Sequence, residues 1–256
     1  MVEGWLDWRI ANNVDAIRDE IVEKGLNAPI LFPGGELILR LAPQVILASN
    51  HRDKVGNAIS VETLVPATIW THISVENYLK FRIYCLEYCA MILEQISEEM
   101  EQIEKAKNSD GVYGVVAQLT ILRCMKGMSL SQFTKENKEV AGKIMTMASD
   151  NYPELMAKCY LVNCPWYFST VYAFAKMFLA AKTVAKISVL GSDFLKYITT
   201  DVELSSVPDF LGGQMTVFNE PYKFNFSEGG PLWYDGMVVP QQDQSAVNGE
   251  AAKDIA

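Results

Sequence analysis

The sequence lacks the short motifs that mark the common catalytic sites. It contains no nucleophile elbow, no Walker-type phosphate loop, no dinucleotide-binding glycine fingerprint and no paired-histidine metal motif. Glycine-bearing turns occur at residues 33–35 and 111–114, but neither lies between a strand pattern and a helix pattern, as a phosphate-binding loop requires. The sequence therefore predicts a protein that is not an enzyme.

Histidine and cysteine are also sparse, with two and five residues respectively. The cysteines show neither the spacing of a disulfide framework nor that of a zinc site. Cys85 and Cys89 lie one helical turn apart, but no histidine completes a metal-binding set with them. We therefore expect free thiols in a reducing compartment, with no metal and no cofactor.

No stretch has the roughly 20 uninterrupted apolar residues of a membrane span, and the N-terminus has no signal-peptide pattern. The most apolar stretch, residues 168–190, is interrupted by Lys176, Lys182 and Lys186. The formal net charge of −9 argues against a nucleic-acid partner, because phosphate binding requires a basic face. With 50% hydrophobic residues, the chain is expected to form one sizeable domain, or a large lobe with a small one, in the cytoplasm.

The pattern that is present centres on residues 151–213. Apolar runs at 156–162 and 185–190 flank a helical pattern at 166–179, which predicts a strand, a helix and a second strand of a parallel sheet. A further strand is expected at 115–122, followed by a helix to residue 148 that Ser129 or Ser131 would cap. The unusual residue is Lys186, because a lysine in a buried strand needs a counter-charge or access to water.

The N-terminal half predicts further elements of the same α/β fold. They are a helix at 5–24, a short helix at 37–41, strands at 45–48 and 58–61 joined by a turn at 53–57, and a long helix from the N-cap Ser74 to about 107.

Six motifs follow one another in the central stretch: YPE at 152–154, NxPW at 163–166, FST at 168–170, KxFL at 176–179, TVxKIxxLGS at 183–192 and VPDFLGG at 207–213. In this order they resemble the CRAL-TRIO lipid-binding domain, in particular that of the phosphatidylinositol/phosphatidylcholine transfer proteins. The resemblance implies an α/β fold with a mixed, mainly parallel sheet and flanking helices around an apolar lipid pocket. The domain would span 27–236, between the remnant of a mostly missing N-terminal helical lobe (1–26) and a disordered tail (237–256).

The resemblance also implies a headgroup site made of Glu154, Thr183 and Lys186. Lys186 and Thr183 would bind the phosphate oxygens, and Glu154 would accept hydrogen bonds from inositol hydroxyls. The alternative is a purely structural ion pair between Glu154 and Lys186.

The apolar parts of the predicted site are a pocket wall and a gate helix, and a packed core without a pocket would use the same residues. The wall comprises Leu119, Ile121, Leu161, Phe174, Phe178, Ile187 and Val189. The gate helix, which swings away at the membrane in the family, comprises Trp166, Phe168, Tyr172, Phe174, Lys176, Met177 and Phe178. Met177 replaces the family's proline, which favours a more continuous helix. Leu119 and Ile121 stand where the family has hydroxyls that hold phosphatidylcholine, which disfavours that ligand.

These observations predict a protein that binds phospholipid, favours phosphatidylinositol, exchanges it at a transient membrane contact and presents it to lipid kinases. Two alternatives stay open. The chain could recruit partners to membranes or act as a scaffold without moving lipid, or it could carry another small apolar ligand.

Overall fold

The computed structural model describes residues 2–25, 28–42, 44–107, 114–152 and 154–215. The predicted tail at 237–256 and the predicted domain end at 236 lie outside these residues.

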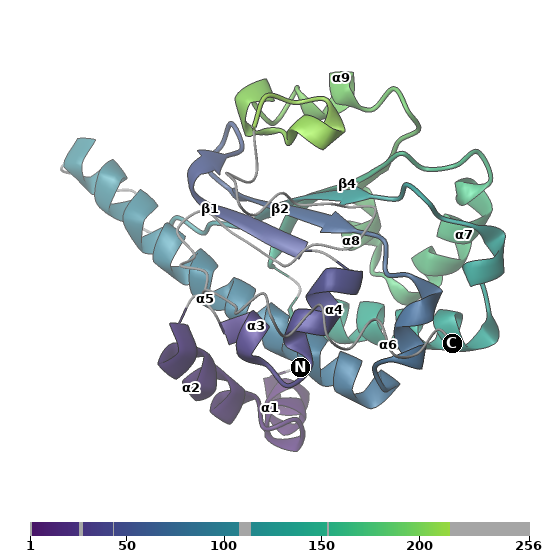
Figure 1. Ribbon diagram of the computed structural model, residues 1–256. Coiled ribbons are helices and arrows are strands. Elements are labelled where there is room, and N and C mark those ends of the chain that lie inside the picture. The colour runs from purple at the N-terminus through teal and green to yellow at the C-terminus, as the bar shows by residue number, and fades with distance from the viewer. Residues whose placement is uncertain (1, 26–27, 43, 108–113, 153, 216–256) are drawn as a thin grey trace, which may run out of the picture.

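A five-stranded sheet in the order β1-β2-β3-β4-β5 forms the centre of the molecule (Figure 1). The strands are β1 (Gln44–Arg52), β2 (Ala58–Thr63), β3 (Leu119–Cys124), β4 (Met156–Val162) and β5 (Ile187–Val189). Strand β1 runs antiparallel to β2, and every other neighbouring pair is parallel. The mixed, mainly parallel sheet is therefore confirmed, with β4 at its predicted bounds. The expected strand at 115–122 starts only at Leu119, and the one at 185–190 is reduced to three residues.

Helices connect the parallel strands, as the sequence predicts. Helix α5 (Val75–Lys107) joins β2 to β3, and α6 (Lys135–Asn151) joins β3 to β4. The last crossover consists of α7 (Phe168–Ala175), the 3-10 turn η4 (Lys176–Phe178) and α8 (Ala181–Ala185). The earlier turn η2 (Ala67–Thr71) precedes α5.

Two helix starts test the predicted caps. The hydroxyl of Ser74 accepts a hydrogen bond from the Asn77 N–H at 3.2 Å, so this N-cap is confirmed. The cap predicted for α6 is wrong, because Thr134 accepts from the Asn137 N–H at 3.1 Å. Ser129 instead caps the short turn η3 (Leu130–Gln132).

The N-terminal segment forms two helices, α1 (Val2–Ala11) and α2 (Val14–Lys24), where the sequence predicts one. They separate at Asn13, whose φ of 52° is in the left-handed region, which asparagine adopts more readily than most residues. The short helices α3 (Ala28–Leu31) and α4 (Gly35–Leu41) follow, and α4 confirms the helix expected at 37–41.

Two layers cover the sheet (Figure 1). The C-terminal segment, with α9 (Leu195–Ile198), η5 (Leu204–Ser206) and η6 (Asp209–Leu211), lies on the face that carries Tyr160, whose hydroxyl bonds to Asp201. The opposite face, which we call the inner face, carries Ile121, Arg123, Cys159 and Leu161 at neighbouring positions of β3 and β4. Helices α5 and α7 pack over the inner face.

Candidate ligand-binding site

Helix α7 lies over the inner face near β4 and β5. The predicted single helix at 166–179 is shorter in the structure, because the α-helix ends at Ala175 and Met177 lies in the 3-10 turn η4. Phe168 and Tyr172 are buried and stack with ring centroids 6.2 Å apart. By contrast, 92% of Trp166 and 71% of Met177 are exposed, so this segment presents apolar side chains on both sides.

Four of the seven predicted wall residues gather beneath α7. Phe168 and Tyr172 form an apolar cluster with Met125, Cys159 and Leu161, and the half-buried side chains that pack against this cluster include Ile121, Ile187 and Val189. Leu119 belongs instead to the main core of the domain.

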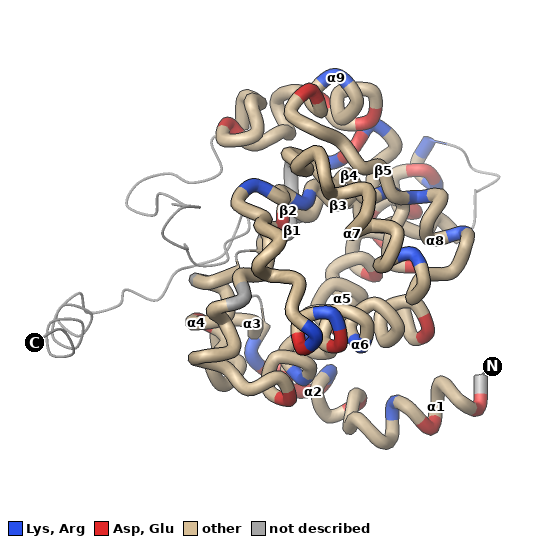
Figure 2. The backbone as a smooth tube through the Cα atoms, turned by 90° about the vertical axis from the view of Figure 1, so that its right-hand side faces the viewer, with Lys and Arg blue, Asp and Glu red and all other residues tan. Residues whose placement is uncertain are grey.

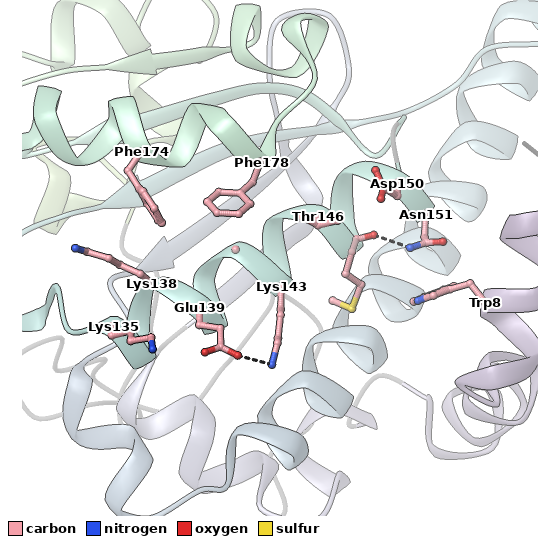
Figure 3. Close-up of a pocket in the computed structure, with 12 residues that line it drawn as sticks. Trp8, Lys135, Lys138, Glu139, Lys143, Thr146, Asp150, Asn151, Phe174 and Phe178 are labelled. Atoms are coloured by element: carbon pink, nitrogen blue, oxygen red, sulfur yellow. Dashed lines mark hydrogen bonds and ion pairs between the residues drawn. The ribbon is translucent and has the colours of Figure 1, made fainter.

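The other two predicted wall residues, Phe174 and Phe178, face helix α6 (Figure 3). They border an open groove of about 830 Å³, which is also lined by lysines of α6 and by Trp8 of α1. Lys138 Nζ lies 5.8 Å from the Phe174 ring centroid. A Cβ at Gly142 would lie 3.0 Å from the Phe178 ring, so glycine permits this close packing.

The three predicted headgroup residues lie at the N-terminal ends of β4 and β5, near α8. Lys186 follows α8 directly and precedes β5, so it is not part of the strand as expected. Its Nζ donates to the Met156 carbonyl at 2.6 Å. Thr183 lies one turn earlier, within α8, and is half-buried.

Glu154 forms its ion pair with Lys182, at 3.1 Å, rather than with Lys186. The hydrogen bond and charge of Lys182, with a smaller effect of Lys186, lower the pKa of Glu154. Figure 2 shows basic residues around α8, at the edge of the sheet beside α7. The sequence did not predict Lys182 as the partner of Glu154, because the two residues lie 28 positions apart.

A buried ionic group on the inner face was also missed. Arg123 Nε donates to Glu62 Oε2 at 2.8 Å, and Arg82 Nη1 of α5 donates to Gln44 Oε1 at 2.7 Å. Burial would raise the pKa of Glu62, but the charges of Arg123 and Arg82 outweigh it and keep this pKa below its usual value. The carboxylate is therefore charged in the folded protein.

The described part of the chain holds no group of three or more His, Cys, Asp or Glu side chains placed to bind a metal ion. Burial raises the pKa of the Cys85 and Cys159 thiols to about 12, so both are protonated at neutral pH. Among the helices described, none is both long and apolar enough to cross a membrane.

A family model of the CRAL/TRIO domain matches residues 45–213. The chain belongs to this family. The matched range includes β2 to β5 and the cluster beneath α7. It also includes Glu154, Thr183 and Lys186. The resemblance found in the six motifs and the fold expected from it are therefore confirmed.

Two relatives illustrate which proteins this chain is similar to. The phosphatidylinositol/phosphatidylcholine transfer protein SFH4 of Arabidopsis thaliana is 31% identical over 242 residues, which are 93% of this chain and 36% of that protein. The SEC14 cytosolic factor of Yarrowia lipolytica is 34% identical over 129 residues, which are 49% of this chain and 25% of that protein. The chain thus spans less than half the length of these relatives. The crystal structure of Sfh5 aligns with a TM-score of 0.47 at 18% identity, over 62% of this chain and 49% of that one.

Proposed function

We propose that this CRAL/TRIO domain binds phosphatidylinositol and transfers it between membranes without converting it chemically. The name of the SFH4 relative, a phosphatidylinositol/phosphatidylcholine transfer protein, supports lipid transfer as the general role. The preference for phosphatidylinositol is our inference from the residues of the candidate site.

The observation that carries the proposal is the cluster at the ends of β4 and β5. Lys182 and Lys186 provide two ammonium groups and Thr183 a hydroxyl within five residues, and all three suit phosphate oxygens. Glu154 is exposed and can accept hydrogen bonds from a polyhydroxylated ring. A lipid phosphate would compete with Glu154 for Lys182, so we expect their ion pair to rearrange on binding.

Two side chains argue against phosphatidylcholine as the main ligand. Leu119 is buried in the main core and Ile121 contacts the cluster under α7, and neither offers a hydroxyl to a choline headgroup. The acyl chains would occupy space bordered by Ile121, Leu161, Ile187 and Val189, which is apolar enough to replace the bilayer interior.

The segment around α7 would contact the membrane and open to admit lipid. Trp166 and Met177 are exposed apolar side chains. Lys176 is also exposed, next to Met177, and its ammonium group suits anionic headgroups. We expect the protein to bind this membrane surface peripherally and transiently. There it would present its lipid to lipid kinases.

Transfer of labelled phosphatidylinositol between vesicles tests the proposal. We expect Lys186→Ala to lower the transfer rate by about tenfold or more, because it removes a charged hydrogen bond to the phosphate. Lys80→Ala is the matched control, since Lys80 is exposed on α5 and, among the described residues, forms its ion pair with Glu76 one turn away. Equal rates for the two folded variants would refute the headgroup assignment. Vesicle binding by a wild-type chain that transfers no lipid would support the alternative of a membrane-recruitment module.

A further inference from the structure

The ionic group on the inner face carries more positive than negative charge. Glu62 Oε2 accepts two hydrogen bonds from Arg123, and Glu62 Oε1 accepts from Gln44 at 3.2 Å and from Ser60 at 3.3 Å. Arg82 adds a second guanidinium, which interacts electrostatically with Glu62. Two arginines therefore share one carboxylate, whose oxygens are already occupied, and the group has a net charge of +1.

Both guanidinium groups keep hydrogen-bond donors to spare. Arg123 uses Nε and Nη2 on Glu62, and its Nη1 has no partner among the residues that the structure describes. Arg82 donates only to Gln44 within the same part of the chain. Although β3 is the third of five strands, 38% of the Arg123 side chain is exposed. Part of the Arg123 side chain is therefore accessible to solvent, although its strand lies in the middle of the sheet.

A third donor approaches from helix α7. Tyr172 is only 9% exposed, and its hydroxyl is buried without a hydrogen-bond partner within the described ranges. It packs in one cluster with Cys159 and Leu161, and Leu161 is the register partner of Arg123 on the neighbouring strand β4. A buried hydroxyl without a partner is costly to leave unsatisfied, which points to a ligand atom that completes it.

We propose that the space between α7 and the inner face binds the carboxylate of a long-chain fatty acid, with Arg123 and Tyr172 as its donors. The net charge of +1 matches a monoanion, whereas a choline group would meet two arginines and a phosphate monoester would bring a second negative charge. The neighbouring Ile121, Leu161, Ile187 and Val189 provide an apolar surface for the chain. This site uses none of Glu154, Thr183 and Lys186, but it shares the apolar residues proposed to border the acyl chains of phosphatidylinositol, so we expect the two lipids to compete for that space.

The affinities of the full protein chain for oleate and methyl oleate test this proposal. The two ligands have the same hydrocarbon tail, but only oleate carries a negative charge. We expect oleate to bind about tenfold more tightly, and Tyr172→Phe to reduce oleate affinity by about tenfold while methyl oleate is unaffected. Tyr167→Phe is the matched control, since the Tyr167 hydroxyl already donates to the Met128 carbonyl at 2.6 Å. It should leave the preference for oleate intact.

A second readout is the ¹³C resonance of carboxyl-labelled oleate. In the wild-type complex the carboxyl should stay ionised at a lower pH than in free oleate, because the arginines favour the anion. The proposal would be overturned by equal affinities for oleate and its methyl ester, or by no binding of either. It would also be overturned if Tyr172→Phe lowered the affinities for both ligands equally. Transfer of phosphatidylinositol by the same preparation is measured separately, so a failed fatty-acid site does not decide the phospholipid site.

Discussion

Replacing Glu87 with glutamine should destabilise the domain far more than the same change at Glu94, although both carboxylates lie on α5 and pair with Arg18. Glu87 is 1% exposed, and it accepts from the Tyr152 hydroxyl at 2.7 Å and from Arg9 Nη1 at 3.1 Å. Its second oxygen lies 3.6 Å from Arg18. Glu87 thus ties α1, α2 and the end of α6 to α5.

The magnitude follows from what the substitution removes. Glutamine keeps the shape and one acceptor oxygen, but it removes the charge that compensates Arg9, which is itself mostly buried. Breaking a buried charge pair costs about 3–5 kcal/mol. Because Arg9 keeps Asp15 at 2.5 Å as a partner, we expect the lower value, about 3 kcal/mol, or a Tm lower by about 6–12 °C.

Glu94→Gln is the control, since 58% of Glu94 is exposed and an exposed ion pair contributes about 0–1 kcal/mol. Urea unfolding of both variants, followed by circular dichroism, gives the two free energies of unfolding. Equal and small losses would refute the reasoning, because they would mean that the buried carboxylate is replaceable by a neutral amide.

Three further outcomes are expected. Gly142→Ala should change the free energy of unfolding by less than about 1 kcal/mol, because the higher helix propensity of alanine offsets the cost of displacing the Phe178 ring. The same substitution should speed lipid exchange, because it weakens the contact between η4 and α6. Glu62→Gln should cost about 3 kcal/mol at pH 7 by urea unfolding. Because the folded-state pKa of Glu62 lies below its ordinary value of 4.5, this stabilisation is present above that value and is lost as the pH falls through the folded pKa. Trp166→Ser should weaken vesicle binding in a sedimentation assay by about thirtyfold, since inserting a large apolar side chain contributes about 2 kcal/mol.

Each of these has its contradicting result. An unchanged exchange rate in Gly142→Ala would mean that the contact between η4 and α6 does not hold the segment. A gap between wild type and Glu62→Gln that stays constant from pH 7 to acid would mean that the charge of Glu62 is not stabilising. Trp166→Ser should keep the wild-type unfolding curve, and unchanged vesicle binding would exclude Trp166 from the membrane contact.

The strands and long helices could be predicted because each has a strong local pattern. The run at 156–162 is apolar and bounded by turn residues, and β4 has those bounds. Ser74 begins the periodic pattern of α5, and its hydroxyl caps the helix. In these elements the local preference and the tertiary packing agree.

Elsewhere two local signals competed. The residues around Lys186 include β-branched side chains, which favour a strand. In the structure, however, helix α8 ends at Ala185 and β5 begins at Ile187, directly after Lys186. At Asn13 the apolar spacing continues across the break, so periodicity alone could not show that the backbone turns left-handed there. Ser129 and Thr134 are both good caps, and each begins a different element.

The site depended on contacts that no local pattern encodes. Arg123 meets Glu62 because β2 and β3 pair in parallel with these two residues in register, which sequence spacing does not give. In the same way, only the packing of α6 against η4 turns Phe174 and Phe178 toward the groove and away from the cluster under α7. The motif resemblance suggested Glu154, Thr183 and Lys186 as headgroup residues, but it did not predict the ion pair between Glu154 and Lys182.

The most direct test of the central claim is native mass spectrometry, with lipid extraction, of the chain purified from a eukaryotic or lipid-supplemented source. We expect phosphatidylinositol at close to one molecule per chain, and its loss in Lys186→Ala. A chain that purifies empty and takes up no phosphatidylinositol from vesicles would contradict it.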